Sequence, residues 1–157
     1  MNQDCKRLLK LIEKQLEKDI DCGVYDGNLI GLSNYEIEDY ENYFVIDFFS
    51  IKLSGIDDEV ELRFYIFEDI LRIDVYFGHL DKDLSVLKLI NDFNDEESLF
   101  WTAYIEKSKN LFTLSHTEKY SLKTFEEDFN MAFSLLLNIK DNPVIQTLTK
   151  LTYEVEQ

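Results

Sequence analysis

Apolar residues are concentrated between Tyr43 and Phe77, and in the second half of this stretch they alternate with polar residues at the period of two that is typical of β-strands. The nearly continuous apolar run over 43–53 predicts a strand buried on both faces. Residues 60–66 and 71–77 alternate strictly, which predicts two strands that each have one solvated face. Because the connections between these strands are short, they predict an antiparallel meander.

Helical periodicity precedes and follows this meander. Apolar residues spaced three and four positions apart predict helices over residues 3–19, 81–94 and 122–139, and Pro143 suits the first position of a short last helix. Residues 99–106 and 111–116 alternate and predict a hairpin. Strands grouped in this way predict an α+β fold, with a five-stranded, mainly antiparallel sheet and helices packed mainly on one face.

The same periodicities predict which side chains form the hydrophobic core. Hydrophobic residues make up 45% of the 157 residues, which suits one domain over 1–157 with a sizeable core. Positions on the apolar side of an expected helix or strand should be buried. The expected core residues are Leu8, Ile12, Leu62, Phe64, Ile73, Val75, Leu87, Ile90, Trp101, Phe129, Phe133 and Leu136.

The acidic residues are concentrated in one half of the chain. Eight carboxylates and no lysine or arginine lie between Asp19 and Ile51, in a chain whose net charge is −16. Residues 20–41 show no strong periodicity, and the glycines among them lack the Gly-Lys-Ser/Thr ending of a phosphate loop. We therefore expect an acidic, loop-rich segment over 20–41, either as one long loop or with a weak strand around 24–32.

The charge argues against several classes of partner. Nucleic acids and anionic membranes are bound through clusters of lysine and arginine, which a chain of net charge −16 does not offer. No apolar run reaches the ~18 residues of a membrane span, and the N-terminal region lacks the apolar core of a secretory signal. Cys5 and Cys22 are too few for a disulfide framework, so we expect free thiols in a reducing compartment. These features predict a cytoplasmic protein.

The residue types that usually perform catalysis or bind metals are isolated in this sequence. His79 and His116 are far apart, and neither has a second histidine or cysteine at metal-ligand spacing, so surface or capping roles are expected. Aspartates surround Cys22, and their negative charges disfavour a reactive thiolate. Carboxylate runs such as 95–97 fall in expected turns, where solvation explains them. We therefore expect no catalytic residue, no cofactor and no metal site.

The acidic segment and its aromatic neighbours suggest a surface that binds another protein. Charges without a local counter-ion attract a positively charged partner, and tyrosines among carboxylates favour protein recognition. The alternative is a solvated segment that only keeps the protein soluble. The expected partner-binding residues are Tyr35, Glu36, Glu38, Asp39, Tyr40 and Glu41 from this segment, with Tyr65 and Tyr76 from the charged face of two adjacent strands.

The second expected helix ends in Leu-Ile-Asn-Asp-Phe-Asn at 89–94, and the next strand carries Phe-Trp-Thr-Ala-Tyr at 100–104. With the order of elements over residues 43–140, these short motifs resemble the YbjN-like and type III secretion chaperone-like proteins. The resemblance implies an acidic, cytoplasmic α+β protein without catalytic residues that binds or regulates other proteins. The long acidic segment before the first strand departs from that pattern.

Two classes of function remain open from the sequence. The first is a non-enzymatic binding protein whose acidic surface engages a basic or amphipathic segment of a partner. It could act as a chaperone-like regulator or as an immunity protein that neutralises a toxin, since acidic inhibitors gain association rate by electrostatic steering. The second is an enzyme with a carboxylate site that no motif reveals. A large pocket with two carboxylates of displaced pKa would favour the enzyme.

Overall fold

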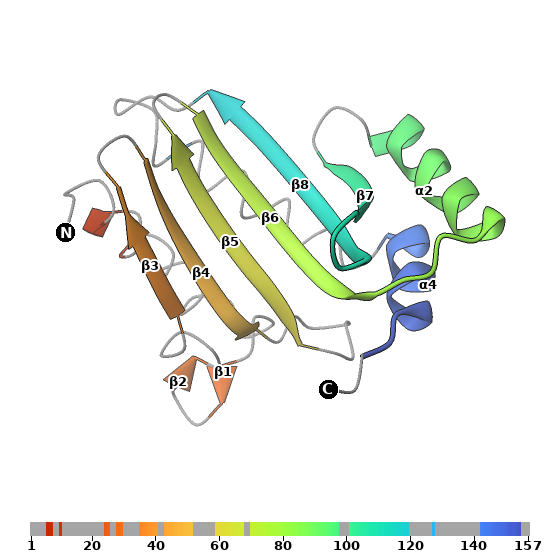
Figure 1. Ribbon diagram of the computed structural model, residues 1–157, viewed down its shortest axis with the longest axis horizontal. Coiled ribbons are helices and arrows are strands. Elements are labelled where there is room, and N and C mark those ends of the chain that lie inside the picture. Colours follow the sequence, from red (N-terminus) through yellow and green to blue (C-terminus); the bar gives the residue numbers. More distant parts are fainter. Residues whose placement is uncertain are drawn as a thin grey trace.

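The computed structural model describes residues 6–7, 10, 24–25, 28–29, 35–40, 43–51, 59–67, 70–97, 101–119, 127 and 142–154. Within them the chain forms a six-stranded antiparallel sheet, a separate two-stranded ladder and two helices (Figure 1). Lys6, Arg7, Lys10 and Glu127 are helical, as expected, but most of the expected helices over 3–19 and 122–139 lies outside the described residues. Cys5 and Cys22 lie outside them too.

The large sheet contains the predicted meander and the predicted hairpin. Its strands follow the order β3-β4-β5-β6-β8-β7, and all neighbours are antiparallel. The meander is β4-β5-β6, and the hairpin β7-β8 places β8 against β6. The strands are β3 (Tyr35–Asp39), β4 (Tyr43–Ile51), β5 (Val60–Phe67), β6 (Ile70–His79), β7 (Thr102–Glu106) and β8 (Leu111–Lys119).

The expectation of five strands is wrong by one, because β3 lies within the segment expected to be loop-rich. Its sequence has an acidic residue at three of five positions, so hydrophobic alternation does not reveal it. Ile37 is the position that packs partly buried against the core, opposite Ile46 of β4. The Tyr40 amide donates to the Tyr43 carbonyl at 2.8 Å and closes the turn between the two strands. The short ladder β1 (Val24–Tyr25) with β2 (Asn28–Leu29) matches the weak-strand alternative for 24–32.

One face of the sheet carries the hydrophobic core. Of the expected core residues, Leu62, Phe64, Ile73, Val75, Ile90 and Trp101 are buried. Leu87 was expected in the core and is instead 40% exposed, because the helix that contains it buries Val86, Ile90 and Phe93. The other expected core residues, Leu8, Ile12, Phe129, Phe133 and Leu136, lie outside the described residues.

The two helices, α2 (Leu84–Glu97) and α4 (Pro143–Leu151), lie side by side beyond the end of the sheet where β7 ends it (Figure 1). Asp83 caps α2 by accepting a hydrogen bond from the Val86 amide at 2.9 Å, and this bond lowers the pKa of Asp83. Asn142 caps α4, whose first residue is Pro143 as the sequence predicts. No helix among the described residues combines the length and the apolar character needed to cross a bilayer.

Asn94 joins α2 to the hairpin. Its side-chain amide donates to the Ala103 carbonyl at 2.9 Å, and its side-chain oxygen accepts from the Ala103 amide at 2.7 Å. The asparagine thereby extends the edge of β7 as a neighbouring strand would, and it satisfies two backbone groups there. The end of α2 is held in this way against the sheet.

We expect Asn94→Ala to lower the free energy of unfolding by about 1–3 kcal/mol, because two backbone groups of Ala103 lose their partners. Asn94→Asp should lower the free energy of unfolding by about the same amount, since a carboxylate cannot donate to the Ala103 carbonyl. Urea denaturation followed by circular dichroism measures both. Asn91→Ala, at an exposed position of the same helix, is the control and should stay within about 0.5 kcal/mol of the native protein.

Candidate functional site

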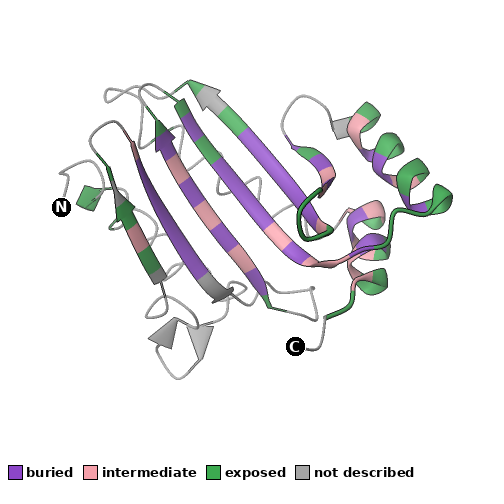
Figure 2. Ribbon diagram, viewed as in Figure 1, coloured by how far each residue is buried: buried purple, intermediate pink, exposed green. Residues whose placement is uncertain are grey.

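Polar side chains occupy the other face of the sheet, which we call the polar face. Figure 2 shows the alternation that produces it, as buried and partly buried residues take turns along β5. Strand register brings one row of polar residues across all six strands, each residue opposite the next. This polar row consists of Glu36, Asp47, Arg63, Asp74, Ser115 and Thr102.

Arg63 and Asp47 form an ion pair near the centre of the polar row. Asp47 Oδ2 accepts from Arg63 Nη2 at 2.9 Å and from Nε at 3.2 Å. The Asp47 residue is only 8% exposed, so this carboxylate depends on its partner for stabilisation. Partial burial alone would lower the pKa of Arg63, but the contacts with Asp47 raise it, so the guanidinium stays charged. The guanidinium also lies 5.4 Å from the ring centre of Tyr76.

Asp74 is the hub of a second polar cluster. Its Oδ1 accepts from Ser115 Oγ at 2.6 Å and from Arg72 Nε at 2.9 Å, and its Oδ2 accepts from Tyr76 at 3.0 Å. Arg72 Nη2 donates in turn to the Tyr104 hydroxyl at 3.1 Å. The cluster fixes four side chains around one buried carboxylate, so the middle of the polar face is a preorganised surface.

Two clefts of about 210 Å³ each open on the polar face, and Arg63 lines both. The first, which we call the acidic cleft, lies over β3, β4 and β5. Its lining residues are Glu36, Glu38, Tyr43, Val45, Asp47, Arg63 and Tyr65. The second, the turn cleft, lies toward the β7–β8 turn. It is lined by Glu61, Arg63, Tyr76, Glu106, Ser108, Lys109 and Leu111.

Tyrosine rings form one wall of the acidic cleft. The ring of Tyr43 stacks on Tyr65 with centroids 5.5 Å apart, and it stacks on Tyr40 at 4.5 Å. Desolvation and the neighbouring Tyr40 and Glu38 raise the pKa of Tyr43, so its hydroxyl stays neutral. The cleft therefore combines carboxylates with neutral aromatic rings, and both attract the ammonium or guanidinium group of a partner.

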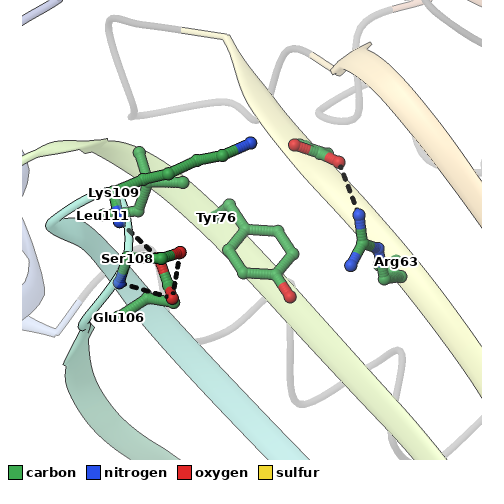
Figure 3. Close-up of a pocket in the computed structure, with 7 residues that line it drawn as sticks. Arg63, Tyr76, Glu106, Ser108, Lys109 and Leu111 are labelled. Carbon is green, nitrogen blue, oxygen red and sulfur yellow. Dashed lines mark hydrogen bonds and ion pairs between the residues drawn. The ribbon is translucent and has the colours of Figure 1, made fainter.

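In the turn cleft, the ring of Tyr76 lies between Arg63 and the residues of the turn (Figure 3). Glu106 accepts from Ser108 Oγ at 2.6 Å and from the Lys109 amide at 2.9 Å, and these bonds lower the pKa of Glu106. Burial and Asp74 raise the pKa of Tyr76 above its ordinary value, so its hydroxyl stays protonated. Burial and Asp47 raise the pKa of Glu61 to about 7.

The structure brings part of the expected partner-binding set together. Glu36, Glu38 and Tyr65 line the acidic cleft, and the exposed Tyr40 stacks on its wall. Tyr76 lies on the same face but in the turn cleft. Tyr35 and Asp39 belong to β3, although the description does not extend to their side chains, and Glu41 lies outside the described residues.

The residues that organise this face are not among those expected from the sequence; they are Asp47, Glu61, Arg63 and Asp74. Their positions could have been found, because strict alternation in β5 and β6 places Glu61, Arg63 and Asp74 on the polar side. Asp47 lies opposite Arg63 because of the register between β4 and β5, and a single sequence does not specify that register.

The histidines differ in their surroundings. His79 Nδ1 lies 2.6 Å from the Lys109 carbonyl oxygen, which suits the expected surface or capping role. His116 was expected at the surface or in a cap and is buried instead, with its ring 5.8 Å from that of Trp101, because it lies on the core face of β8 opposite Ile73.

Possible metal ligands do not gather on this face: within the described ranges, no three His, Cys, Asp or Glu side chains converge in a way that could hold an ion. What the polar face offers is a fixed array of carboxylates, two arginines and tyrosines, an array suited to binding charged groups. Comparison of the chain with protein-family models, curated proteins and solved structures finds no match.

Proposed function

We propose that this protein is a non-enzymatic binding protein that engages a basic or amphipathic segment of a protein partner through the acidic cleft. The observation that carries the proposal is the union of Glu36 and Glu38 with the stacked rings of Tyr43 and Tyr65 in one cleft. Carboxylates attract a lysine or arginine of the partner, and the rings contact its alkyl stem and its charge.

The position of the cleft supports a protein partner. β3 is the terminal strand of the sheet as described, so the cleft lies at its border and an extended segment can approach it from the side. The net charge of −16 repels nucleic acids and anionic surfaces and accelerates encounter with a basic protein. Such a surface suits a chaperone-like regulator in the cytoplasm. It also suits the alternative, an immunity protein that neutralises a toxin.

The enzyme alternative has one supporting observation, the pair formed by Glu61 and Asp47. A catalytic carboxylate must reach the reacting atoms of a substrate, however, and Asp47 is buried with Arg63 bound to its Oδ2. Glu61 Oε1 lies 3.6 Å from the same Arg63 Nη2, so both carboxyl groups belong to one ion-pair cluster. The geometry therefore favours a stabilising role for this pair over a catalytic one.

The test compares two double variants that change the net charge equally. Glu36→Gln with Glu38→Gln removes two carboxylates from the acidic cleft. Asp92→Asn with Asp95→Asn removes two exposed carboxylates from α2, at the opposite end of the sheet (Figure 1). We expect the first pair to lower the association rate with the partner about tenfold at low salt and to flatten its salt dependence.

The partner is first isolated by affinity capture at low and high salt, and association is then measured by surface plasmon resonance. At physiological salt the α2 variant should change the association rate less than about twofold, because exposed charges beyond a Debye length of ~8 Å are then screened. Equal effects of the two double variants would mean that net charge alone matters. The acidic cleft would then be a solubilising surface and not the docking site.

A further inference from the structure

Asp47 presents one carboxylate oxygen that has no donor in the described part of the chain. Its Oδ2 accepts from Arg63 Nη2 at 2.9 Å and from Arg63 Nε at 3.2 Å, whereas its Oδ1 is buried without a hydrogen-bond partner. The residue is 8% exposed and lines the acidic cleft. A buried acceptor without a donor costs free energy, so a ligand in the cleft that supplies the donor recovers this cost.

The charges around Asp47 show that the missing donor is a cation. Glu36 of β3 lies opposite Asp47, and Glu38 lines the same cleft. Neither glutamate forms an ion pair within the ranges that the structure describes. Arg63 is the one cation among the lining residues, and its Nη2 already lies 2.9 Å from Asp47 and 3.6 Å from Glu61. The acidic cleft therefore has more carboxylates than Arg63 neutralises.

We propose that the acidic cleft receives a lysine side chain of the partner in preference to an arginine, and that the ammonium group donates to Asp47 Oδ1. The inference rests on the proposed function, because it names the side chain that the acidic cleft takes. An ammonium has three N–H donors on one small nitrogen, so one bond to Asp47 leaves two for Glu36 and Glu38. The alkyl stem then lies along the stacked rings of Tyr43 and Tyr65.

The pairing of Asp47 with Arg63 disfavours a second guanidinium. A guanidinium binds a carboxylate best through two parallel hydrogen bonds, one to each oxygen. Arg63 already occupies Asp47 Oδ2 through two of its nitrogens, so only Oδ1 remains for the partner. An ammonium needs no more than this one acceptor.

Asp47 Oδ1 is buried in the free protein, so side chains of the cleft must change rotamer to admit the ammonium. Such changes are common when protein partners bind. Glu36 and Glu38 are exposed and have room to move. The backbone of the sheet can therefore keep its register while the lysine enters.

The experiment uses the native protein and four peptides of the sequence Gly-Ser-X-Ser-Gly, acetylated and amidated at their ends. The central residue X is lysine, arginine, trimethyllysine or acetyllysine. Affinities are measured at physiological salt from the NMR shifts of the backbone amides of Asp47, Tyr43 and Tyr65. We expect the lysine peptide to bind about fivefold more tightly than the arginine peptide, which lacks a two-oxygen acceptor in the cleft. It should bind about tenfold more tightly than the trimethyllysine peptide, which keeps the charge without an N–H donor, and than the neutral acetyllysine peptide.

Three results would overturn the inference. Equal binding of the lysine and arginine peptides would mean that the cleft responds to charge alone. Trimethyllysine binding as tightly as lysine would mean that the tyrosine rings hold the cation and Asp47 Oδ1 does not. The third is a lysine peptide that leaves the amides of the cleft unshifted at millimolar concentrations.

The variant Glu36→Gln with Glu38→Gln, measured with the same peptides, separates failure of this inference from failure of the proposed function. If lysine and arginine bind equally and the double variant weakens both, the docking site stands and the preference for lysine is lost. If the double variant leaves the binding of every peptide unchanged, the acidic cleft is not the docking site. Asp92→Asn with Asp95→Asn, on α2, is the control and should change the affinity for the lysine peptide less than about twofold.

Discussion

Phe64→Ala is expected to lower the free energy of unfolding by about 3–5 kcal/mol. Phe64 is fully buried on β5, a strand with neighbours on both sides, and its ring packs edge-on against Phe48 of β4 with centroids 6.0 Å apart. Truncation removes a large apolar side chain and leaves a cavity that two adjacent strands cannot close without breaking their ladders. Urea denaturation monitored by the fluorescence of the single tryptophan, Trp101, measures the loss.

Phe67→Ala is the matched control, because Phe67 belongs to the same strand but is 38% exposed. It makes the same chemical change three residues away and should lower the free energy of unfolding by about 1 kcal/mol or less. Equal losses for the two variants would mean that β5 is not anchored by the core face. The assignment of Phe64 to the centre of the core would then be wrong.

The comparison of these phenylalanines shows why the central strands could be predicted from the sequence. Burial alternates strictly along β5, so hydrophobic periodicity alone predicts both the strand and the side on which Phe64 lies. β3 could not be found in this way, because β4, its neighbour in the described sheet, supplies the backbone pairing that makes it a strand. Glu36 and Glu38 were therefore assigned correctly to a surface but wrongly to a loop.

The residues of the polar face, too, could be predicted from the sequence only in part. Alternation predicts that Arg63 and Asp74 point away from the core, but not that register aligns them with Asp47 and Ser115. The absence of lysine and arginine from Asp19 to Ile51 suggested carboxylates without counter-ions. For Asp47 the counter-ion is Arg63, which comes from the next strand and is invisible to a search of the local sequence.

Asp74→Ala is expected to lower the free energy of unfolding by about 2–4 kcal/mol, although it removes a polar residue. The residue is 5% exposed and accepts hydrogen bonds from Ser115, Arg72 and Tyr76. Ser115 is buried as well, so its hydroxyl loses its acceptor without gaining access to water. Asp92→Ala, which removes an exposed carboxylate from α2, should stay within about 0.5 kcal/mol of the native protein.

A double-mutant cycle with Ser115→Ala separates the two contributions to this loss. If the cost of Asp74→Ala arises from the stranded Ser115 hydroxyl, the double variant should be about 1 kcal/mol more stable than the sum of the single variants implies. If the losses in free energy of unfolding of the two single variants add up to that of the double variant, the cost of Asp74→Ala arises from the pairing with Arg72 and Tyr76 instead. Well-packed apolar residues often stabilise a buried position as well as an ion pair does, so stability alone does not account for a carboxylate here. The Asp74 cluster holds Arg72, Tyr76 and Tyr104 in place, with the Tyr76 ring beside Arg63, and a fixed array of this kind is what the proposed recognition of a charged partner would require.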